Sequence, residues 1–276
     1  MRGKELRMSK LFNAESGNAV IIPVDHGLVM GSLEGLTDPV SVLKKLVESG
    51  IDATLMSPGL AKMTANLFVG KNSPARILTV DLPLISSVPG EFEDVVSHKR
   101  VSSVEYALKW GFDAVKVLFP WGLEREIQAQ SISVVAEFVA ECDRWEVPLM
   151  VEPVLWGNLI PKERKKDSNL IESAARIAME IGADIIKMPY TGDKEEFSKI
   201  VSNLHVPVVV LGGPRMESII DVLGVARDSI DAGAKGIVFG RNVWQYPRVS
   251  DLVSALNEIV HGNLEVSVVV QKYNLS

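Results

Sequence analysis

The chain has 276 residues, of which 47% are hydrophobic and 23% are charged, and its formal net charge is −6 at pH 7. This composition is that of an ordinary globular protein that is long enough to bury one large core. The negative charge excludes a basic surface for nucleic acid or anionic membranes, and no run approaches the roughly 18 to 20 apolar residues that span a bilayer. The first residues lack the apolar segment of a signal peptide, and the single Cys142 excludes an internal disulfide. We therefore expect a cytoplasmic protein with no nucleic-acid or membrane partner.

Short runs rich in Val, Ile and Leu alternate along the chain with segments of helical periodicity, which is typical of a parallel sheet built from βαβ units. The pattern predicts eight strands, over residues 19–24, 53–57, 76–80, 114–119, 149–154, 184–188, 206–211 and 236–239. It predicts helices after them, over residues 39–49, 62–68, 103–109, 124–144, 170–181, 195–203, 216–232 and 249–260.

Eight strand–helix pairs favour a closed barrel over an open sheet. Four predicted helices end at a glycine, the residue that best tolerates the left-handed conformation of a helix end: Gly50, Gly111, Gly182 and Gly233. We expect one domain over residues 1–276 with the α/β fold of a (β/α)8 TIM barrel. Residues 1–18 would form an N-terminal extension and residues 262–276 a C-terminal tail.

In such a barrel the chemistry lies at the carboxyl ends of the strands. Lys187 ends the sixth predicted strand, in the segment Ile185-Ile186-Lys187-Met188-Pro189. An inward ammonium is costly unless it is paired or loses its proton, so Lys187 is a candidate nucleophile that forms an imine with a carbonyl substrate. The alternative is a structural lysine that extends from the barrel rim to solvent.

Lys116 ends the fourth predicted strand in the same way. If the two amines lie ~6 Å apart, a repulsion of ~3 kcal/mol would lower the pKa of one of them toward neutrality. The alternative for Lys116 is an ion pair with Asp25 or Glu152. The two interpretations are compatible, since one lysine can be paired while the other reacts.

Asp25 and His26 close the first strand, and Glu152 ends the fifth. Asp25 can orient the imine or relay a proton, and His26 can bind a substrate oxygen or move protons near neutral pH. Alternatively, Asp25 caps the loop and His26 fills the barrel mouth. Glu152 is either the partner of Lys116 or the proton shuttle, because buried carboxylates are rarely left unpaired.

Glycine-rich loops follow the seventh and eighth strands, with Gly212 and Gly213 in the first and Gly240 and Arg241 in the second. Glycines there allow backbone N–H groups to approach an anion, and a guanidinium matches phosphate oxygens. These loops predict a phosphorylated substrate. No metal-ligand spacing is found, so we expect neither a metal nor another cofactor.

Four segments together resemble the archaeal-type class I aldolase family, which includes archaeal fructose-bisphosphate aldolases, aminodideoxyheptulosonate synthases and an autoinducer-processing thiolase. They are Val24-Asp25-His26-Gly27, Lys187-Met188-Pro189-Tyr190-Thr191-Gly192-Asp193, Leu211-Gly212-Gly213-Pro214 and Gly240-Arg241-Asn242-Val243-Trp244-Gln245. The resemblance implies that Lys187 forms the Schiff base, that Asp25 acts in proton transfer, and that the glycine loops, Arg241 and Tyr190 bind a small phosphorylated sugar. It also implies a homo-oligomer, with a decamer as one form.

The fifth strand departs from the fructose-bisphosphate aldolase pattern. A tyrosine serves there as general acid or base, whereas this chain has Val154. Glu152-Pro153, together with Lys116, is more similar to the tagatose-bisphosphate and sulfofructose-phosphate aldolases. The sequence thus predicts a class I aldolase that acts on a phosphorylated ketose. A transaldolase-like or thiolase-like transferase that uses the same lysine, and an inactive barrel that binds a sugar phosphate, are the alternatives.

Overall fold

Eight parallel strands close into a barrel in the computed structural model, which describes residues 2–275. Around the barrel the order is β1-β10-β9-β8-β7-β6-β3-β2. The strands are β1 (Ala19–Pro23), β2 (Ala53–Met56), β3 (Ala75–Thr79), β6 (Ala114–Pro120), β7 (Leu149–Val154), β8 (Ile185–Pro189), β9 (Val208–Leu211) and β10 (Gly236–Val238). All eight correspond to predicted strands, and the (β/α)8 barrel is confirmed.

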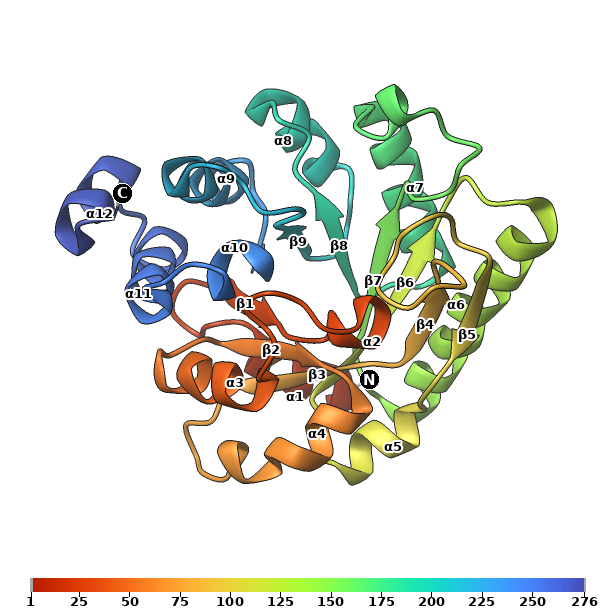
Figure 1. The fold of residues 1–276 in the computed structure, drawn as a ribbon, viewed down its shortest axis with the longest axis horizontal. Helices are drawn as coiled ribbons and strands as arrows, with labels where there is room; N and C mark the ends of the chain where they lie inside the picture. The colour runs from red at the N-terminus through yellow and green to blue at the C-terminus, as the bar shows by residue number, and fades with distance from the viewer. Residues whose placement is uncertain (1, 276) are drawn as a thin grey trace.

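Helices connect the strands and surround them (Figure 1). They are α3 (Pro39–Glu48), α4 (Pro58–Thr64) with the 3₁₀ turn η1 (Ala65–Phe68), α5 (Val104–Lys109), α6 (Arg125–Trp145), α7 (Ser168–Ile181), α8 (Lys194–Ser202), α9 (Ile219–Asp231) and α11 (Val249–Val260). The four glycines expected at helix ends all have positive φ, at 81°, 70°, 116° and 100°.

Two predicted helix starts are wrong for the same physical reason. The helix predicted from residue 62 begins at Pro58, because the Ser57 side chain accepts a hydrogen bond from Leu60 N and Pro58 stands in the first turn. The helix predicted from residue 216 begins at Ile219, because Ser218 accepts from Ile220 N. In both cases a serine N-cap fixes the boundary.

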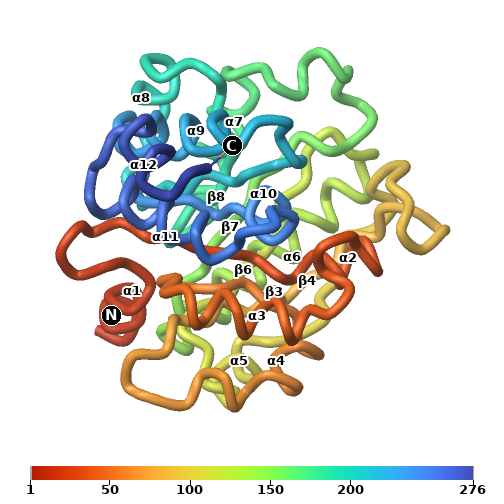
Figure 2. The backbone as a smooth tube through the Cα atoms, turned by 60° about the vertical axis from the view of Figure 1, so that its left-hand side comes forward, coloured from red at the N-terminus to blue at the C-terminus, as the bar shows by residue number. Residues whose placement is uncertain are grey.

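Several further elements lie outside the predicted pattern. They are α1 (Arg2–Leu11), α2 (Gly27–Met30), the antiparallel hairpin of β4 (Asp81–Leu84) and β5 (Ser97–Arg100), η2 (Lys162–Arg164), α10 (Arg241–Trp244) and α12 (Val266–Tyr273). Residues 1–18 and 262–276 thus carry helices, at α1 and α12. The loop between β4 and β5 projects from the molecule on the same side as α2 (Figure 2).

The barrel interior is divided into two zones along its axis. The zone toward the amino ends of the strands is apolar and contains the buried residues Ile21, Leu55 and Met150. Leu11 from α1 packs into the same cluster. Lys4 fixes α1 there through ion pairs of 2.7 Å with Asp143 and Asp184. The charged residues Lys116, Glu152 and Lys187 lie in the other zone, toward the carboxyl ends of the strands.

None of the helices over residues 2–275 combines the length and apolar character that a bilayer crossing requires.

Candidate active site

A cavity of about 560 Å³ occupies the carboxyl end of the barrel. Nine of the ten predicted site residues line it: Asp25, His26, Lys116, Glu152, Lys187, Gly212, Gly213, Gly240 and Arg241. They come from β1, β6, β7, β8 and the loops after β9 and β10. Strand ends that are far apart in the sequence thus meet in one space.

Tyr190 is the exception, because it does not line this cavity. Its ring packs edge-on against Phe197 of α8 at 5.2 Å between ring centroids. Burial raises the pKa of the hydroxyl to about 12, with a further contribution from Asp228 and Asp193. The prediction that Tyr190 binds substrate is therefore not supported by its position.

Glu152 bridges the two lysines. Its Oε2 lies 2.7 Å from Lys116 Nζ and its Oε1 lies 2.8 Å from Lys187 Nζ. The three residues are only 3% to 7% exposed. In the register of β6 and β7, Leu118 pairs with Glu152. Lys116 lies two residues before Leu118, so its side chain extends toward the carboxyl end of the barrel to reach the carboxylate.

The contact of Glu152 with both lysines determines the pKa values of Lys116 and Glu152. Burial alone would lower the pKa of Lys116, but the carboxylates of Glu152, Asp81 and Asp25 outweigh it and raise that pKa above its usual 10.5. Burial would raise the pKa of Glu152, but Lys116 and Lys187 hold it below its usual 4.5. The direct repulsion between the two amines, expected from the sequence, is therefore offset by a carboxylate that lies between them.

Asp25 faces the same space from the end of β1. Thr79 Oγ1 donates a hydrogen bond of 2.6 Å to Asp25 Oδ2. Burial would raise the pKa of Asp25, but the charges of Lys116 and Lys187 and the Thr79 hydrogen bond lower it below its usual 3.8. Asp25 is thus an ionised carboxylate at neutral pH.

His26 is a neutral residue in this environment. Its Nδ1 lies 3.7 Å from Asp25 Oδ1, which is too long for a hydrogen bond, and its ring meets Trp244 edge-on at 5.3 Å. Burial is the main cause that lowers the pKa of His26, and together with the charges of Lys187 and Arg241 it brings this pKa to about 4 against the attraction of Asp25 and Glu152. A pKa in this range favours the other predicted role, in which His26 binds a substrate oxygen, over proton transfer near neutral pH.

The two glycine-rich loops lie side by side because Asn242 joins them. Its Nδ2 donates to Gly212 O at 2.9 Å and to Pro214 O at 3.2 Å, while its Oδ1 accepts from Met216 N at 2.8 Å. In the sequence Asn242 stands out only as part of the motif that follows Gly240, and its role as a link between the loops depends on its burial in the fold.

Arg241 is left with free hydrogen-bonding capacity beside these glycines. Its Nε is buried and has no hydrogen-bond partner within residues 2–275, and burial lowers the pKa of its guanidinium. Close packing also explains Gly240, where a Cβ atom would lie 2.5 Å from His26 Cε1. A half-buried guanidinium without a carboxylate is suited to an anionic ligand.

A buried network beneath the β4–β5 hairpin was not foreseen from the sequence. His98 Nε2 lies 2.7 Å from Asp81 Oδ2, His98 Nδ1 lies 3.1 Å from Ser131 Oγ, and Leu118 N donates to Asp81 at 2.9 Å. His98 and Asp81 are fully buried and do not line the cavity. The network therefore anchors the hairpin on β6 and α6, and Asp81 adds to the negative potential at Lys116.

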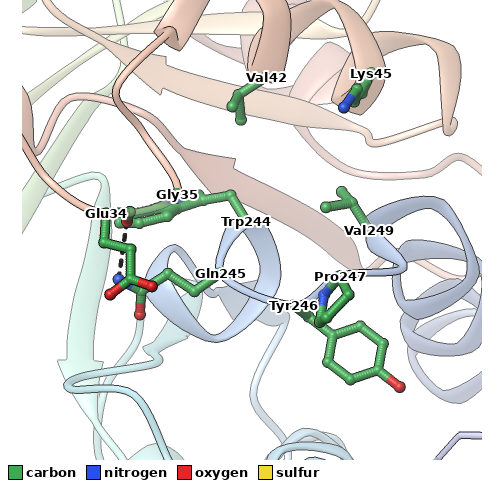
Figure 3. Close-up of a pocket in the computed structure, with 9 residues that line it drawn as sticks. All are labelled: Glu34, Gly35, Val42, Lys45, Trp244, Gln245, Tyr246, Pro247 and Val249. Carbon is green, nitrogen blue, oxygen red and sulfur yellow. Dashed lines mark hydrogen bonds between the residues drawn. The ribbon is translucent and has the colours of Figure 1, made fainter.

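A smaller cavity of about 280 Å³ lies outside the barrel (Figure 3). Val42 and Lys45 of α3 line one side, and Trp244 lines the other. Gln245 Nε2 donates to Glu34 O at 3.0 Å across its edge. None of the predicted site residues lines this cavity, so the chemistry belongs to the larger one.

Comparison with known proteins identifies the family of the chain. A family model described as DeoC/LacD family aldolase matches residues 19–246. The chain belongs to this family.

The similarity to individual proteins extends over nearly the whole chain. An uncharacterized aldolase of Saccharolobus solfataricus is 33% identical over 96% of this chain and 97% of its own. The 2-amino-3,7-dideoxy-D-threo-hept-6-ulosonate synthase of Halobacterium salinarum is 29% identical over 95% of this chain and 93% of its own.

Solved structures agree with these relatives. A crystal structure of an archaeal fructose 1,6-bisphosphate aldolase has a TM-score of 0.80 at 28% identity, covering 94% of this chain and 99% of that one. A second structure, of an archaeal fructose-1,6-bisphosphate aldolase whose catalytic lysine is bound to a carbinolamine intermediate, has a TM-score of 0.79 at 28% identity, covering 94% and 100%. The predicted resemblance is confirmed, and the chain is a class I aldolase.

Within residues 2–275 no three His, Cys, Asp or Glu side chains come together to hold a metal ion.

Proposed function

We propose that Lys187 is the Schiff-base lysine and that the substrate is a phosphorylated ketose. The observation that carries this proposal is the Lys187–Glu152–Lys116 bridge at the end of β7 and β8. A lysine that is 7% exposed, borders a cavity and contacts a carboxylate has both access to a carbonyl and a group to take its proton. Archaeal relatives with a covalently modified lysine support the same assignment.

The first step requires a neutral amine. Glu152 Oε1, at 2.8 Å, is placed to accept the proton that Lys187 Nζ releases. The amine then attacks the ketone carbon. Glu152 returns its proton to the hydroxyl of the carbinolamine, which leaves as water, so that an iminium ion forms and Glu152 is ionised again before the next step. Lys116 remains an ammonium throughout, because its pKa is raised, and it keeps Glu152 anionic between turnovers.

The carbon–carbon bond then breaks with its electron pair moving into the iminium. The hydroxyl proton of the departing fragment must leave at the same time, because that fragment becomes an aldehyde. We assign this proton to Glu152, which projects from the same strand as Val154, where relatives have a tyrosine. We assign to Asp25, which accepts a hydrogen bond from Thr79, the orientation of the Schiff base and proton transfer at it. Protonation of the enamine and hydrolysis of the imine then release the ketone.

The phosphate of the ketose binds at Gly212, Gly213, Gly240 and Arg241. The free Arg241 Nε and the linked loops support this placement. The strand β9, which carries one of these loops, lies next to β8 in the barrel, so a phosphate there is close to the carbonyl at Lys187.

A transferase that uses the same lysine is the second candidate. It is favoured by the relative from Halobacterium salinarum, which is named as a synthase. In that case the enamine would attack a second substrate instead of being protonated. Product analysis with and without an added acceptor separates the two reactions.

We also propose that residues 1–276 form one domain and that the protein is a cytoplasmic homo-oligomer. The supporting observations are the continuous barrel and the family resemblance, and the net charge of −6 speaks against a nucleic-acid partner. Light scattering after size-exclusion chromatography would test the oligomeric state.

The nucleophile is tested by borohydride reduction in the presence of dihydroxyacetone phosphate. We expect a covalent adduct whose mass matches the reduced imine and which maps to Lys187. Lys187→Met should abolish both the adduct and turnover, whereas Lys109→Met, on the exposed side of α5, should change neither. An adduct on Lys116, or turnover by Lys187→Met, would contradict the proposal.

A further inference from the structure

The contacts of Glu152 do not by themselves distinguish the two lysines. Its carboxylate oxygens lie 2.7 Å from Lys116 Nζ and 2.8 Å from Lys187 Nζ. Both lysines border the same cavity, and both are almost fully buried. Asp25 also faces both amines, since the charges of both lower its pKa. A difference in protonation between the two amines has to come from a group that acts on only one of them.

Asp81 is placed to act on Lys116. It follows β3, which lies next to β6 in the barrel, whereas β7 separates β6 from the strand β8 that carries Lys187. Its side chain is fully buried, and its Oδ2 accepts a hydrogen bond of 2.9 Å from Leu118 N, two residues after Lys116 on β6. The charge of Asp81 is one of the causes that raise the pKa of Lys116 above its usual 10.5.

The hydrogen bonds of His98 leave the charge on Asp81 uncompensated. His98 Nε2 lies 2.7 Å from Asp81 Oδ2, and His98 Nδ1 lies 3.1 Å from Ser131 Oγ. The Ser131 hydroxyl is fully buried and has no other partner within residues 2–275, so it donates its proton to His98 Nδ1. His98 is then a neutral imidazole that donates from Nε2, and these three residues together carry the single negative charge of Asp81.

The other oxygen of this carboxylate has no hydrogen bond at all. Asp81 Oδ1 is buried and has no hydrogen-bond partner among the residues that the structure describes. Arg100, which lies opposite in the register of β4 and β5, pairs instead with Glu137 and Glu141 of α6. A fully buried carboxylate needs a cation near it, because water does not solvate its charge. Lys116 supplies that positive charge.

We propose that the charge of Asp81 determines which of the two lysines is the nucleophile. It keeps Lys116 protonated, so that the proton accepted by Glu152 comes from Lys187, which becomes the free amine. This proposal rests on the Schiff-base function proposed above. Asp81 is a positioning residue, because it acts through Lys116 and does not line the cavity.

The effect is needed at the step in which Glu152 takes up a proton. Lys116 then loses its closest counter-charge, and the carboxylates of Asp81 and Asp25 remain near it. Without the charge of Asp81, Lys116 would compete with Lys187 as the proton donor to Glu152, and it would be a neutral amine in a larger fraction of the molecules.

The proposal is tested with formaldehyde and cyanoborohydride, which methylate amines in proportion to their neutral fraction. Because both lysines line one cavity, the ratio of methylation at Lys116 to that at Lys187 reports the difference in their protonation. Asp81→Asn removes the charge and keeps an oxygen that can accept from Leu118 N and His98. We expect this ratio, measured by peptide mapping at pH 8, to rise about tenfold or more, as the loss of one charge within ~10 Å predicts at a dielectric constant near 20.

Ser131→Ala is the matched control, because it removes the far end of the same buried network and leaves the charge of Asp81 in place. We expect the methylation ratio to stay at the wild-type value in this variant, even if its free energy of unfolding falls. Asp81→Ser, a second variant without the charge, should give the same rise as Asp81→Asn. An unchanged ratio in the two Asp81 variants, or an equal rise in Ser131→Ala, would overturn the proposal.

A second measurement separates this proposal from the one on which it rests. Borohydride reduction of the wild type with dihydroxyacetone phosphate tests the Schiff base alone. If the adduct forms on Lys187 but Asp81→Asn leaves the methylation ratio unchanged, the Schiff base stands and the role of Asp81 is wrong. If the methylation ratio rises as expected but no adduct forms, the effect of Asp81 on Lys116 stands and the assignment of a nucleophile fails.

Discussion

Glu152 Oε1 lies 2.8 Å from Lys187 Nζ at the carboxyl ends of neighbouring barrel strands. This contact couples the proposed nucleophile to the proposed proton shuttle, so a change in one residue alters the charge of the other. The second oxygen of the same carboxylate is held by Lys116, which fixes the orientation of both contacts.

Glu152→Gln keeps the shape of the side chain and removes the group that titrates. We expect borohydride still to trap the imine on Lys187, although more slowly because the amine must lose its proton to water, while carbon–carbon cleavage falls by roughly 10²- to 10⁴-fold, the usual contribution of general acid–base catalysis. The comparison is Asp25→Asn, measured by trapping and by steady-state cleavage. Cleavage near the wild-type rate in Glu152→Gln, with loss in Asp25→Asn, would move the shuttle to Asp25.

Lys116→Met removes a charge that holds the pKa of Glu152 low. Without it that pKa rises, so Glu152 becomes protonated at a higher pH than in the wild type. We expect the acid limb of the kcat profile to shift upward and the activity to recover partly as the pH is raised. A profile that keeps its shape at a uniformly lower rate would instead indicate that Lys116 contacts the substrate directly.

Arg241→Ala should weaken binding more than it slows the bound complex, because a phosphate clamp contributes equally to substrate and transition state. We expect KM to rise by about tenfold or more, since hydrogen bonds to charged groups contribute roughly 1.5 to 3 kcal/mol. Inorganic phosphate should compete with substrate in the wild type. Arg215→Ala, in the loop after β9 but outside the cavity lining, is the matched control. Equal turnover of an unphosphorylated ketose by wild type and Arg241→Ala would refute the phosphate site.

His26 makes stability depend on pH in a defined window. Because its pKa falls from 6.5 to about 4 on folding, the unfolded chain takes up this proton at a higher pH than the folded protein. The contribution of neutral His26 is therefore complete above pH 6.5 and is lost as the pH falls through about 4, by at most about 3 kcal/mol. His26→Gln should flatten the free energy of unfolding between these pH values in denaturant titrations. An unchanged slope would show that His26 does not titrate in this way.

The barrel could be predicted because its strands are buried on both faces and are therefore continuous apolar runs, as in the segment from Ala19 to Pro23. The polar residues that interrupt these runs near their ends, such as Lys116 and Glu152, were identified for the same reason. In a parallel barrel the carboxyl ends of all strands lie at the same face. Most residues of the candidate site could therefore be predicted once the barrel was predicted.

Other features depend on contacts between distant segments. The helix α1 was missed because most of its residues are polar, and its role depends on Leu11, which enters the barrel. The burial of His98 depends on pairing across the β4–β5 hairpin with Asp81, 17 residues earlier in the chain. Whether Glu152 contacts one lysine or both could not be derived either, because strand register and lysine rotamers decide it.

Leu11 and the apolar residues packed around it fill the amino end of the barrel, beneath the cavity at the carboxyl end. Both fragments of a cleaved ketose must leave through the mouth by which the ketose entered. In the proposed mechanism the ketone fragment is still bonded to Lys187 when the aldehyde is free, so the aldehyde departs first, and in synthesis the ketone has to enter first. With the amino end of the barrel filled by Leu11 and its neighbours, both fragments then share the path at the carboxyl end.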